Sequence, residues 1–597
     1  MILEYDIIVI GGGHAGCEAA SAAARLGSRT LLLTMDMTKM ASMSCNPAVG
    51  GVAKGQIVRE IDALGGQMGR ITDLTTIQFR MLNRSKGAAM WSPRAQCDKS
   101  RFSAQWRHTL ENTVNLYIWQ DAATELLFDT AGVKPRIKGV RTQMGIEFAC
   151  RAVVLTSGTF LGGMMHCGTS HAEGGRAGDA ASHGITESLR AIGFETGRMK
   201  TGTPARLDAR TIDFESLEPQ YGDENPAKFS FSPETQPVKE QLPCFLVYTS
   251  KEVHDILRTG FDRSPLFNGT ICGIGPRYCP SIEDKVVRFA GKDRHPIFVE
   301  PCGENTEEMY LQGASSSLPE DVQNAFYRSI KGFENIEIMR PAYAIEYDCV
   351  DPTSLEATLE SKVVRGLYGA GQFNGTSGYE EAAAQGLLAG LNAARNALGE
   401  SQLILPRQSS YLGTLVDDLV TKGVMDPYRM MTSRSEYRLT LRQDNADTRL
   451  TPIGREYGLV QDDRWTKYQQ TQAVLDAERR RLHDAHLRTA DLRAAMEAAG
   501  LAPAAEGGIA EELLRRPEID YPLIAGMIGW GEGITPMLAE RLETEIKYAG
   551  YIARQDRMIH EVARHEKTLI PEDFSYTELT GLTLEAREKL ARIRPKN

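Results

Sequence analysis

The sequence has no long apolar run, no paired cysteine motif and no excess of basic residues. None of its hydrophobic stretches approaches the ~20 residues that span a bilayer, so we expect no membrane-spanning helix. The ten cysteines form no CxxC pair and no zinc-ligand spacing, so we expect free thiols and no metal site. A strand-like run that starts at Tyr5 leaves no room for a signal peptide. These features predict a cytoplasmic protein.

The charge balance excludes a globally basic nucleic-acid binder. The chain carries 68 Lys and Arg against 78 Asp and Glu, a net charge of −10. A local basic patch is still compatible with this balance, because phosphate contacts need only a few Lys or Arg on one face. The length of 597 residues is too great for one core, and roughly two to four domains are expected.

The N-terminal segment is typical of a dinucleotide-binding βαβ unit. An apolar run at Tyr5–Ile10 predicts a buried strand, the Ala-rich run Ala15–Leu26 predicts a helix, and Arg29–Thr34 predicts a second parallel strand. Between the first strand and the helix, glycines 11, 13 and 16 fit G-x-G-x-x-G, which lets the backbone approach a pyrophosphate at the helix N-terminus. The acidic residue that usually ends the second strand is replaced by Thr34, and Asp36 follows.

Two later segments favour FAD over NAD as the dinucleotide. Arg151–Thr159 resembles the middle strand and turn of two-dinucleotide flavoproteins, and Gly366–Gln372 resembles their late strand, with Gln372 in place of the usual Asp. An Ala-rich helix is predicted from Glu380 to about Leu398, and its N-terminus could stabilise negative charge on a flavin. The three segments occur in the order that a glutathione-reductase-like, Rossmann-like FAD-binding domain requires.

The composition predicts three domains in an α/β protein. Residues 1–200 and 345–404 form a discontinuous FAD-binding domain, with a small insertion at about 91–125. Residues 201–344 form an inserted mixed α/β domain. Residues 405–597, rich in Arg, Glu, Ala and Leu, form an all-helical C-terminal domain.

Two cysteines are candidate nucleophiles. Cys45 lies in a Pro- and Gly-rich loop that enters a helix, and a nearby Lys54 would favour its thiolate; the alternative is a small buried cysteine. Cys279 follows Arg277 and precedes Lys285, both of which could stabilise a thiolate or bind phosphate. An ordinary turn with a satisfied ion pair is the equally weighted alternative for Cys279.

Five basic residues are candidate RNA contacts. Lys200 and Arg206 flank a Thr-Gly-Thr-Pro turn that suits anion binding, or is simply solvated. Arg434, Arg438 and Arg442 are spaced four apart, which predicts one helical face that could follow phosphates, with interleaved tyrosines for stacking. Neutralisation of these arginines by neighbouring acidic residues is an alternative of similar weight.

Seven motifs resemble those of the MnmG/GidA family of tRNA uridine 5-carboxymethylaminomethyl modification enzymes, and the resemblance covers nearly the whole chain. Family members typically continue beyond the Arg594-Pro595 pair with a short helical segment, whereas this chain ends at Asn597. The motifs are Gly11–Gly16, Ser44–Gly51, Gly174–Asp179, Lys200–Pro204, Gly275–Lys285, Gly371–Glu381 and Tyr428–Met430.

The resemblance implies a homodimeric flavoprotein that works with the GTPase MnmE. Together they add an aminomethyl or carboxymethylaminomethyl group to C5 of the wobble uridine, using methylene-tetrahydrofolate, glycine or ammonium, and NADH. It also implies that the insert binds NADH and substrate and that the C-terminal domain binds tRNA and MnmE. By family pattern Cys45 and Cys279 are catalytic. FAD positions are Gly11, Gly12, Gly13, His14, Ala15, Gly16, Ala123, Ser182 and Gln372, and NAD positions within 275–289 are Gly275, Pro276, Arg277, Tyr278 and Lys285.

The implied chemistry needs a thiol because C5 of uracil is a poor nucleophile. A thiolate that adds at C6 turns C5 into an enolate-like carbon that can attack an iminium carbon. Whether Cys45 or Cys279 supplies this thiolate stays open. The alternatives are a folate- and FAD-dependent tRNA uridine methyltransferase, which is shorter and lacks the helical region, and a non-catalytic FAD-containing RNA-binding protein. A disulfide reductase is disfavoured because no CxxC or CxxxxC cysteine pair lies beside the dinucleotide-binding unit.

Overall fold

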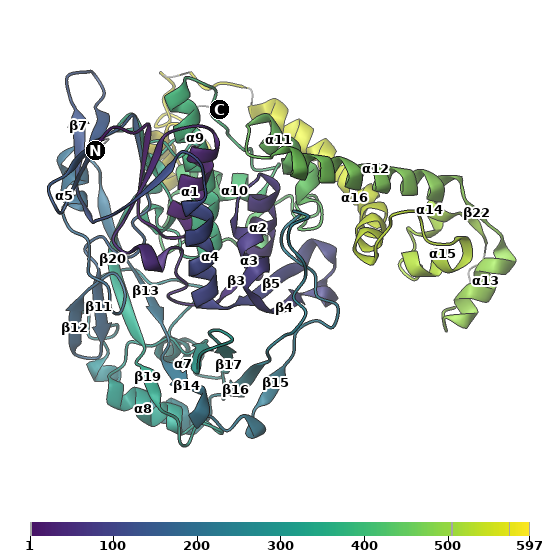
Figure 1. Cartoon of the computed structure of the whole chain (residues 1–597), viewed down its shortest axis with the longest axis horizontal. Coiled ribbons are helices and arrows are strands. Elements are labelled where there is room, and N and C mark those ends of the chain that lie inside the picture. The colour runs from purple at the N-terminus through teal and green to yellow at the C-terminus, as the bar shows by residue number, and fades with distance from the viewer. Residues whose placement is uncertain (1–2, 503–505, 567, 572, 596–597) are drawn as a thin grey trace. The chain divides into compact units, whose positions relative to one another are not determined.

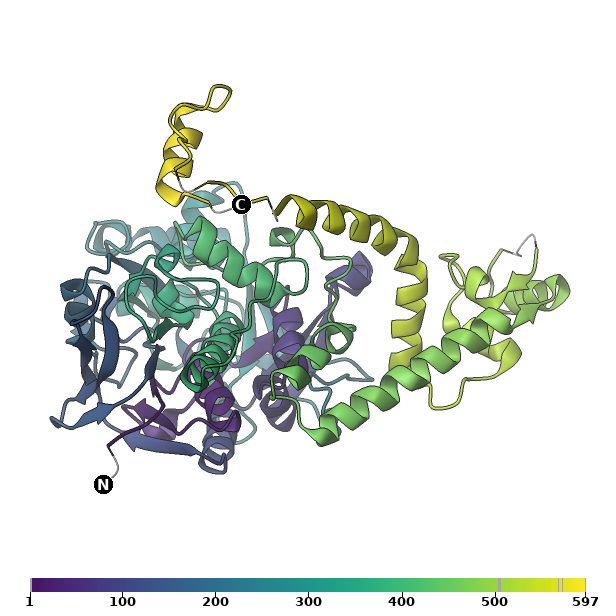
Figure 2. The same cartoon turned by 90° about the horizontal axis from the view of Figure 1, so that it is seen from above.

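The structure is a computed structural model that describes residues 3–502, 506–566, 568–571 and 573–595 (Figure 1, Figure 2). The chain forms two compact units. Unit 1 comprises residues 1–435 and 446–465, and unit 2 comprises residues 436–445 and 466–597. In the part of the chain that is described, no helix is long and apolar enough to cross a membrane.

Unit 1 is built on a five-stranded parallel sheet. Its strands lie in the order β21-β10-β1-β2-β6, and β1, β2 and β10 are buried along their whole length. Strands that are buried along their whole length are typical of a parallel sheet that is covered on both faces. Their bounds are β1 Ile7–Ile10, β2 Thr30–Thr34, β6 Leu116–Gln120, β10 Ala152–Leu155 and β21 Leu367–Gly369.

Helices α1 (His14–Arg25) and α9 (Tyr379–Leu398) lie side by side against this sheet (Figure 1). The two helices approach so closely that two positions of α9 must be glycine. A Cβ on Gly386 would lie 2.0 Å from the Ala15 carbonyl oxygen, and a Cβ on Gly390 would lie 2.3 Å from the Ala19 carbonyl oxygen. The predicted first strand, first helix, second strand and late Ala-rich helix therefore agree with the structure to within one or two residues.

Residues 91–125, predicted as a small insertion, instead belong to the FAD-type fold. β5 (Ser92–Cys97) pairs with β3 (Ala48–Gly50) and β4 (Thr76–Leu82), and α4 (Lys99–Glu111) leads into β6. β6 pairs with β2 as an edge strand of the central sheet. The mixed polar and apolar sequence of β6 hides this role, because an edge strand is only partly buried.

Two smaller antiparallel sheets and an insert complete the non-helical part of unit 1. The strand pair β13–β20 brackets the insert, which has its own sheet, in the order β15-β16-β17-β18-β14-β19, and its own apolar core. The small sheets comprise β7 Ala123–Asp129, β8 Arg136–Thr142 and β9 Glu147–Ala149, then β11 Met164–Cys167, β12 Ser170–Glu173, β13 Thr196–Thr203 and β20 Tyr343–Val350.

The insert is mixed α/β. Its strands are β14 Arg206–Asp208, β15 Glu218–Gln220, β16 Cys244–Tyr248, β17 Pro296–Pro301, β18 Glu308–Gln312 and β19 Ile338–Arg340, and its helices are α6 Lys251–Arg258, α7 Ile282–Arg288 and α8 Glu320–Arg328.

The boundary predicted at residue 405 falls inside unit 1. α10 (Tyr411–Asp417) and α11 (Ala446–Glu456) pack on α2 (Lys54–Ala63). Arg449 forms an ion pair of 2.8 Å with the buried Glu60, which also accepts from the Leu412 amide. The helices that connect or make up unit 2 are α12 Asp462–Asp484, α13 Thr489–Ala498, α14 Ala510–Leu513, α15 Tyr521–Ile528, α16 Pro536–Glu566 and α17 Leu584–Ile593.

Candidate functional site

A cavity of about 1080 Å³ in unit 1 extends from the glycine-rich turn to both candidate cysteines. This volume is at the upper end of the range of ligand pockets, which suits a large cofactor with room for a further group. Gly275, Pro276, Arg277, Lys285 and Gly16 do not line it. The predicted residues that do line it are Gly11, Gly12, Gly13, His14, Ala15, Cys45, Ala123, Ser182, Tyr278, Cys279 and Gln372.

The glycine-rich turn has the space that a dinucleotide needs. Gly11 has a φ of +104°, and a Cβ on Gly16 would lie only 1.8 Å from the Gly11 carbonyl oxygen. At Gly13 a Cβ would meet no protein atom within 4 Å, so the backbone there is open toward the cavity. The turn thus fits a pyrophosphate at the N-terminus of α1.

The end of β2 differs from that of a ribose-binding dinucleotide site. Thr34 lies against the turn, since a Cβ on Gly12 would be 2.7 Å from its hydroxyl oxygen. The Asp36 carboxylate accepts from the amide and hydroxyl of Thr38, at 2.8 and 2.6 Å, and therefore caps its own turn. Asp36 also lines the cavity.

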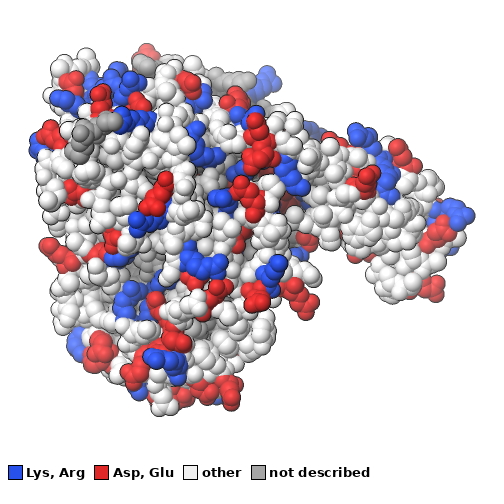
Figure 3. Space-filling model, viewed as in Figure 1, with Lys and Arg blue, Asp and Glu red and all other residues white. Residues whose placement is uncertain are grey.

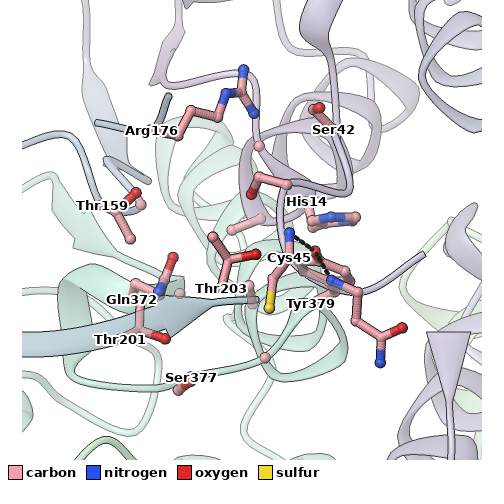
Figure 4. A pocket seen from close by; sticks show the side chains of 18 of the residues that line it. His14, Ser42, Cys45, Thr159, Arg176, Thr201, Thr203, Gln372, Ser377 and Tyr379 are labelled. Atoms are coloured by element: carbon pink, nitrogen blue, oxygen red, sulfur yellow. Dashed lines mark hydrogen bonds between the residues drawn. The ribbon is translucent and has the colours of Figure 1, made fainter. Parts of the chain in front are cut away.

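His14 presents a neutral ring to the cavity (Figure 4). It is 7% exposed, and neither ring nitrogen has a hydrogen-bond partner among the described residues. Its ring stacks on Tyr379 with centroids 4.2 Å apart, and burial lowers its pKa to about 4. Because buried polar atoms normally have partners, these nitrogens are suited to bind a ligand.

Cys45 lies on the cavity wall in a loop held by Tyr379, the first residue of α9. The Tyr379 hydroxyl accepts from the backbone N–H of Cys45 at 2.8 Å and of Asn46 at 3.0 Å, the two dashed lines in Figure 4. The half-buried Cys45 Sγ lies 3.5 Å from the Tyr310 hydroxyl and 3.7 Å from the Gly202 carbonyl oxygen. The thiol thus has a polar setting and faces the cavity, which favours the functional alternative for Cys45 over a small cysteine buried in the core.

Arg206, predicted as an RNA contact, instead supports this loop from inside. Its side chain is 1% exposed and donates to the carbonyl oxygens of Ser44 at 3.1 Å and Cys45 at 2.8 Å. It also donates to Pro204 and pairs with Glu308 at 2.9 Å. The predicted turn is instead the end of strand β13, and Arg206 is buried because β14 lies between two other strands of the insert sheet.

Lys54 does not serve the Cys45 thiol as predicted, because two carboxylates of α9 bind it. Its Nζ lies 2.8 Å from Glu380 and 3.3 Å from Glu381. The cation that acts on both candidate thiols is Arg429, whose charge interacts with Cys279 and Cys45. The Arg429 Nε is buried and has no hydrogen-bond partner among the described residues, and its side chain lines the cavity.

Cys279 reaches the same cavity on a loop that precedes α7. The loop is anchored at its start by Glu346 of β20, which accepts from the amides of Cys272 at 2.9 Å and Gly273 at 2.5 Å. Lys285 donates to the Gly313 carbonyl at 2.7 Å, and burial lowers its pKa. Of the five predicted NAD residues, only Tyr278 lines the cavity.

The predicted arginine stripe does not lie on a helix. The chain forms a single 3-10 turn at Thr432–Arg434 and no helix from Ser435 to Asn445. Arg434 packs 4.1 Å from the centroid of the Tyr428 ring, and Arg438 is exposed. Arg442 is fully buried and pairs with Asp444 at 3.0 Å, so this arginine is neutralised by a neighbouring acidic residue, as in the alternative to an RNA contact.

Lys200 is also largely buried. It lies on β13 with 5% exposure, and its backbone N–H donates to the Ile274 carbonyl at 2.9 Å. A Cβ on Gly275 would lie 3.4 Å from its side-chain Cδ, so Lys200 packs against the loop of Cys279.

Sequence reasoning did not single out Tyr310, Arg429 or Glu346. Arg429 falls in the Tyr428–Met430 motif, so the motif was a usable signal. Tyr310 and Glu346 lie in ordinary strands, and no local pattern distinguishes them from core residues.

Comparison with known proteins identifies relatives over the whole chain. A family model described as glucose inhibited division protein A matches residues 6–401, and two tRNA modifying enzyme MnmG/GidA C-terminal models, a helical domain and a helical bundle, match residues 462–556 and 558–597. The tRNA uridine 5-carboxymethylaminomethyl modification enzymes MnmG of Pelobacter propionicus and Cytophaga hutchinsonii are 53% and 50% identical; they cover 99% and 100% of this chain, which spans 94% and 96% of theirs. A solved structure of Aquifex aeolicus GidA, in its form II crystal, is 44% identical with a TM-score of 0.89, and the match covers 100% of this chain and 95% of that chain.

Proposed function

Because the chain belongs to the MnmG/GidA family of tRNA uridine 5-carboxymethylaminomethyl modification enzymes, we propose that it modifies C5 of the wobble uridine. The observation that carries this proposal is that Cys45, Cys279 and the glycine-rich turn line one cavity. A dinucleotide held at the turn and a base presented to the thiols would then share one chamber.

FAD is the cofactor that the cavity fits best. Gly11 and Gly13 would approach its pyrophosphate, the unpartnered His14 ring would donate to or accept from it, and Ala123, Ser182 and Gln372 would complete its wall. When bound, FAD supplies the oxidation–reduction chemistry of the reaction. The N-terminus of α9 directs its positive dipole end at the same wall, whereas the half-buried Lys54 is neutralised by Glu380 and Glu381.

The thiols would activate the base. A thiolate forms a bond to C6 of uracil while the C5–C6 π pair moves toward C5 and the C4 carbonyl, and C5 then attacks the one-carbon electrophile. Loss of the C5 proton and departure of the sulfur restore the ring. Arg429 would stabilise the thiolate form, since its cation acts on both sulfurs.

The finer assignments follow the family resemblance. We propose methylene-tetrahydrofolate as the carbon donor, glycine or ammonium as the nitrogen donor, NADH as the reductant, MnmE as the GTPase partner and a homodimer as the assembly. NADH is proposed to bind to the segment 275–289, in which Arg277 and Tyr278 are exposed.

tRNA is the proposed macromolecular substrate. On the face shown in Figure 3, blue and red side chains are interspersed, so any tRNA contact on this face would rest on local groups rather than on a continuous basic stripe. Arg438, which is exposed, is the member of the predicted arginine set that can contact phosphate without breaking a buried pair.

The test is reconstitution with tRNA, MnmE, GTP, methylene-tetrahydrofolate, glycine or ammonium, and NADH, followed by nucleoside analysis. The proposal expects an aminomethyl or carboxymethylaminomethyl uridine at the wobble position. A plain methyl group on the T-loop uridine, with an unmodified wobble base, would contradict it and favour the methyltransferase alternative. Binding of tRNA with no modified nucleoside would favour the non-catalytic alternative.

A further inference from the structure

The sulfur of Cys45 contacts a phenol that comes from the insert. The Tyr310 hydroxyl oxygen lies 3.5 Å from Cys45 Sγ, and this is the only hydrogen-bond contact of that hydroxyl among the described residues. Tyr310 stands on β18, its side chain is 5% exposed, and it lines the cofactor cavity. The insert therefore delivers a single buried O–H group to the sulfur.

The chemistry of the pair fixes the direction of the hydrogen bond. Burial raises the pKa of the Tyr310 phenol well above its usual value, so the phenol keeps its proton. A neutral thiol is a weak acceptor, whereas a thiolate is an anion that a buried O–H can stabilise through a charge-assisted bond. The contact is thus worth most when Cys45 is ionised.

Arg206 positions both members of the pair. Its guanidinium carbon lies 4.6 Å from the centroid of the Tyr310 ring, and the same group donates to the Cys45 carbonyl. Arg429 and Tyr379 also interact electrostatically with Cys45. Tyr310 differs from these residues because its hydroxyl contacts the Cys45 sulfur itself.

We propose that Tyr310 is a further catalytic residue, whose O–H stabilises Cys45 as the attacking thiolate. The inference rests on the proposed function, and it assigns the C6 nucleophile to Cys45. The thiol proton leaves to solvent, Tyr310 retains its own proton and donates it in a hydrogen bond to Sγ, and the sulfur pair later forms the S–C6 bond. The charge then passes to the uracil ring.

Alkylation of Cys45 by iodoacetamide tests the proposal without tRNA. The rate would be measured against pH on the FAD-loaded full chain, with the labelled peptide quantified by mass spectrometry. Tyr310→Phe is expected to raise the pH midpoint of Cys45 alkylation by about one unit, which slows alkylation roughly tenfold on the acidic side. Tyr343→Phe is the matched control, because Tyr343 lines the same cavity but accepts from the Ala177 N–H at 3.1 Å.

A fluorinated tyrosine at position 310 provides a second variant of almost unchanged shape. Its more acidic O–H is a stronger donor, so the midpoint is expected to fall. An unchanged midpoint in both Tyr310 variants would overturn the proposal. The readout separates the two hypotheses: a shifted midpoint with unmodified tRNA supports the Tyr310–Cys45 bond while contradicting the proposed function.

Discussion

The buried guanidinium of Arg206 donates a hydrogen bond of 2.8 Å to the backbone carbonyl of Cys45. The same side chain also binds the Ser44 carbonyl, so one residue of the insert fixes the loop that carries a thiol of the FAD-type domain. The planar guanidinium also donates to the Pro204 carbonyl and pairs with Glu308, and a single ammonium cannot reproduce this set of contacts. The insert therefore helps to set the conformation of the Cys45 loop and the position of its thiol.

Arg206→Lys is expected to lower wobble modification about tenfold or more and to cost about 1–3 kcal/mol of stability, because buried carbonyls lose their donors. Thermal unfolding and nucleoside analysis measure the two effects. Arg210→Lys is the control, since Arg210 is 71% exposed and pairs with Asp208 at the surface. Equal effects of the two changes would argue against the role of Arg206.

The two glycines of the turn should fail in different ways. Gly16→Ala places a methyl 1.8 Å from the Gly11 carbonyl oxygen, so the flavin-free protein is expected to lose at least about 1–3 kcal/mol of stability. Gly13→Ala meets no protein atom within 4 Å at a φ of −76°, so its flavin-free stability is expected to be unchanged or slightly higher. Its FAD affinity should nevertheless fall, because the methyl fills the space next to the pyrophosphate.

Thermal unfolding of flavin-free protein and equilibrium FAD titration separate these outcomes. A Gly13→Ala protein that binds FAD as tightly as the wild type would contradict the placement of the pyrophosphate at this turn.

A buried carboxyl on α1 should make stability depend on pH. Glu18 accepts from the amides of Gln67 at 2.9 Å and Met68 at 2.6 Å, and burial raises its pKa to about 7. Its unfolded pKa is about 4.3, so the folded state binds more protons between these values. Stability from this group is therefore complete below about pH 4.3 and is lost as pH rises toward about 7.

Glu18→Gln removes this dependence while keeping an acceptor oxygen. Relative to the variant, the wild type is expected to lose up to about 3 kcal/mol between the two pKa values. Thermal unfolding midpoints of both proteins across this range measure the effect. Parallel curves would contradict the raised pKa.

The conformation of the loop that carries Cys279 should depend on the carboxylate of Glu346. In Glu346→Gln the amides of Cys272 and Gly273 face a neutral acceptor, so the loop is expected to open more often and Cys279 to be alkylated several-fold faster. Wobble modification should fall in parallel. Asp348→Asn is the control, because Asp348 lies on the same strand but pairs with Arg198 at 2.7 Å; equal alkylation rates in the two variants would exclude a specific anchor.

The parts of the fold that the sequence predicts are those encoded locally. The apolar run before Gly11, the turn glycines and the Ala-rich helix that ends at Leu398 carry their structure in adjacent residues. Arg206 shows the limit of such reasoning: beside a Thr-Gly-Thr-Pro turn it has the pattern of a surface cation, and only the pairing of β14 inside a sheet buries it.

The site itself was only partly predictable for the same reason. Cys45 and Cys279 lie in motifs that resemblance identifies, and both line the cavity. Their supports, Tyr310 and Glu346, lie in strands whose sequence is that of ordinary core, and they meet the cysteine loops only through long-range strand pairing.

Nucleoside analysis of tRNA treated with Cys45→Ser and Cys279→Ser variants tests the central claim most directly. The variants would be assayed with MnmE, GTP, methylene-tetrahydrofolate, glycine or ammonium, and NADH, after FAD absorbance and tRNA binding have been checked. Each variant is expected to retain FAD and tRNA binding but to leave the wobble uridine unmodified. Wild-type levels of modification by both variants would contradict a thiol mechanism in this cavity.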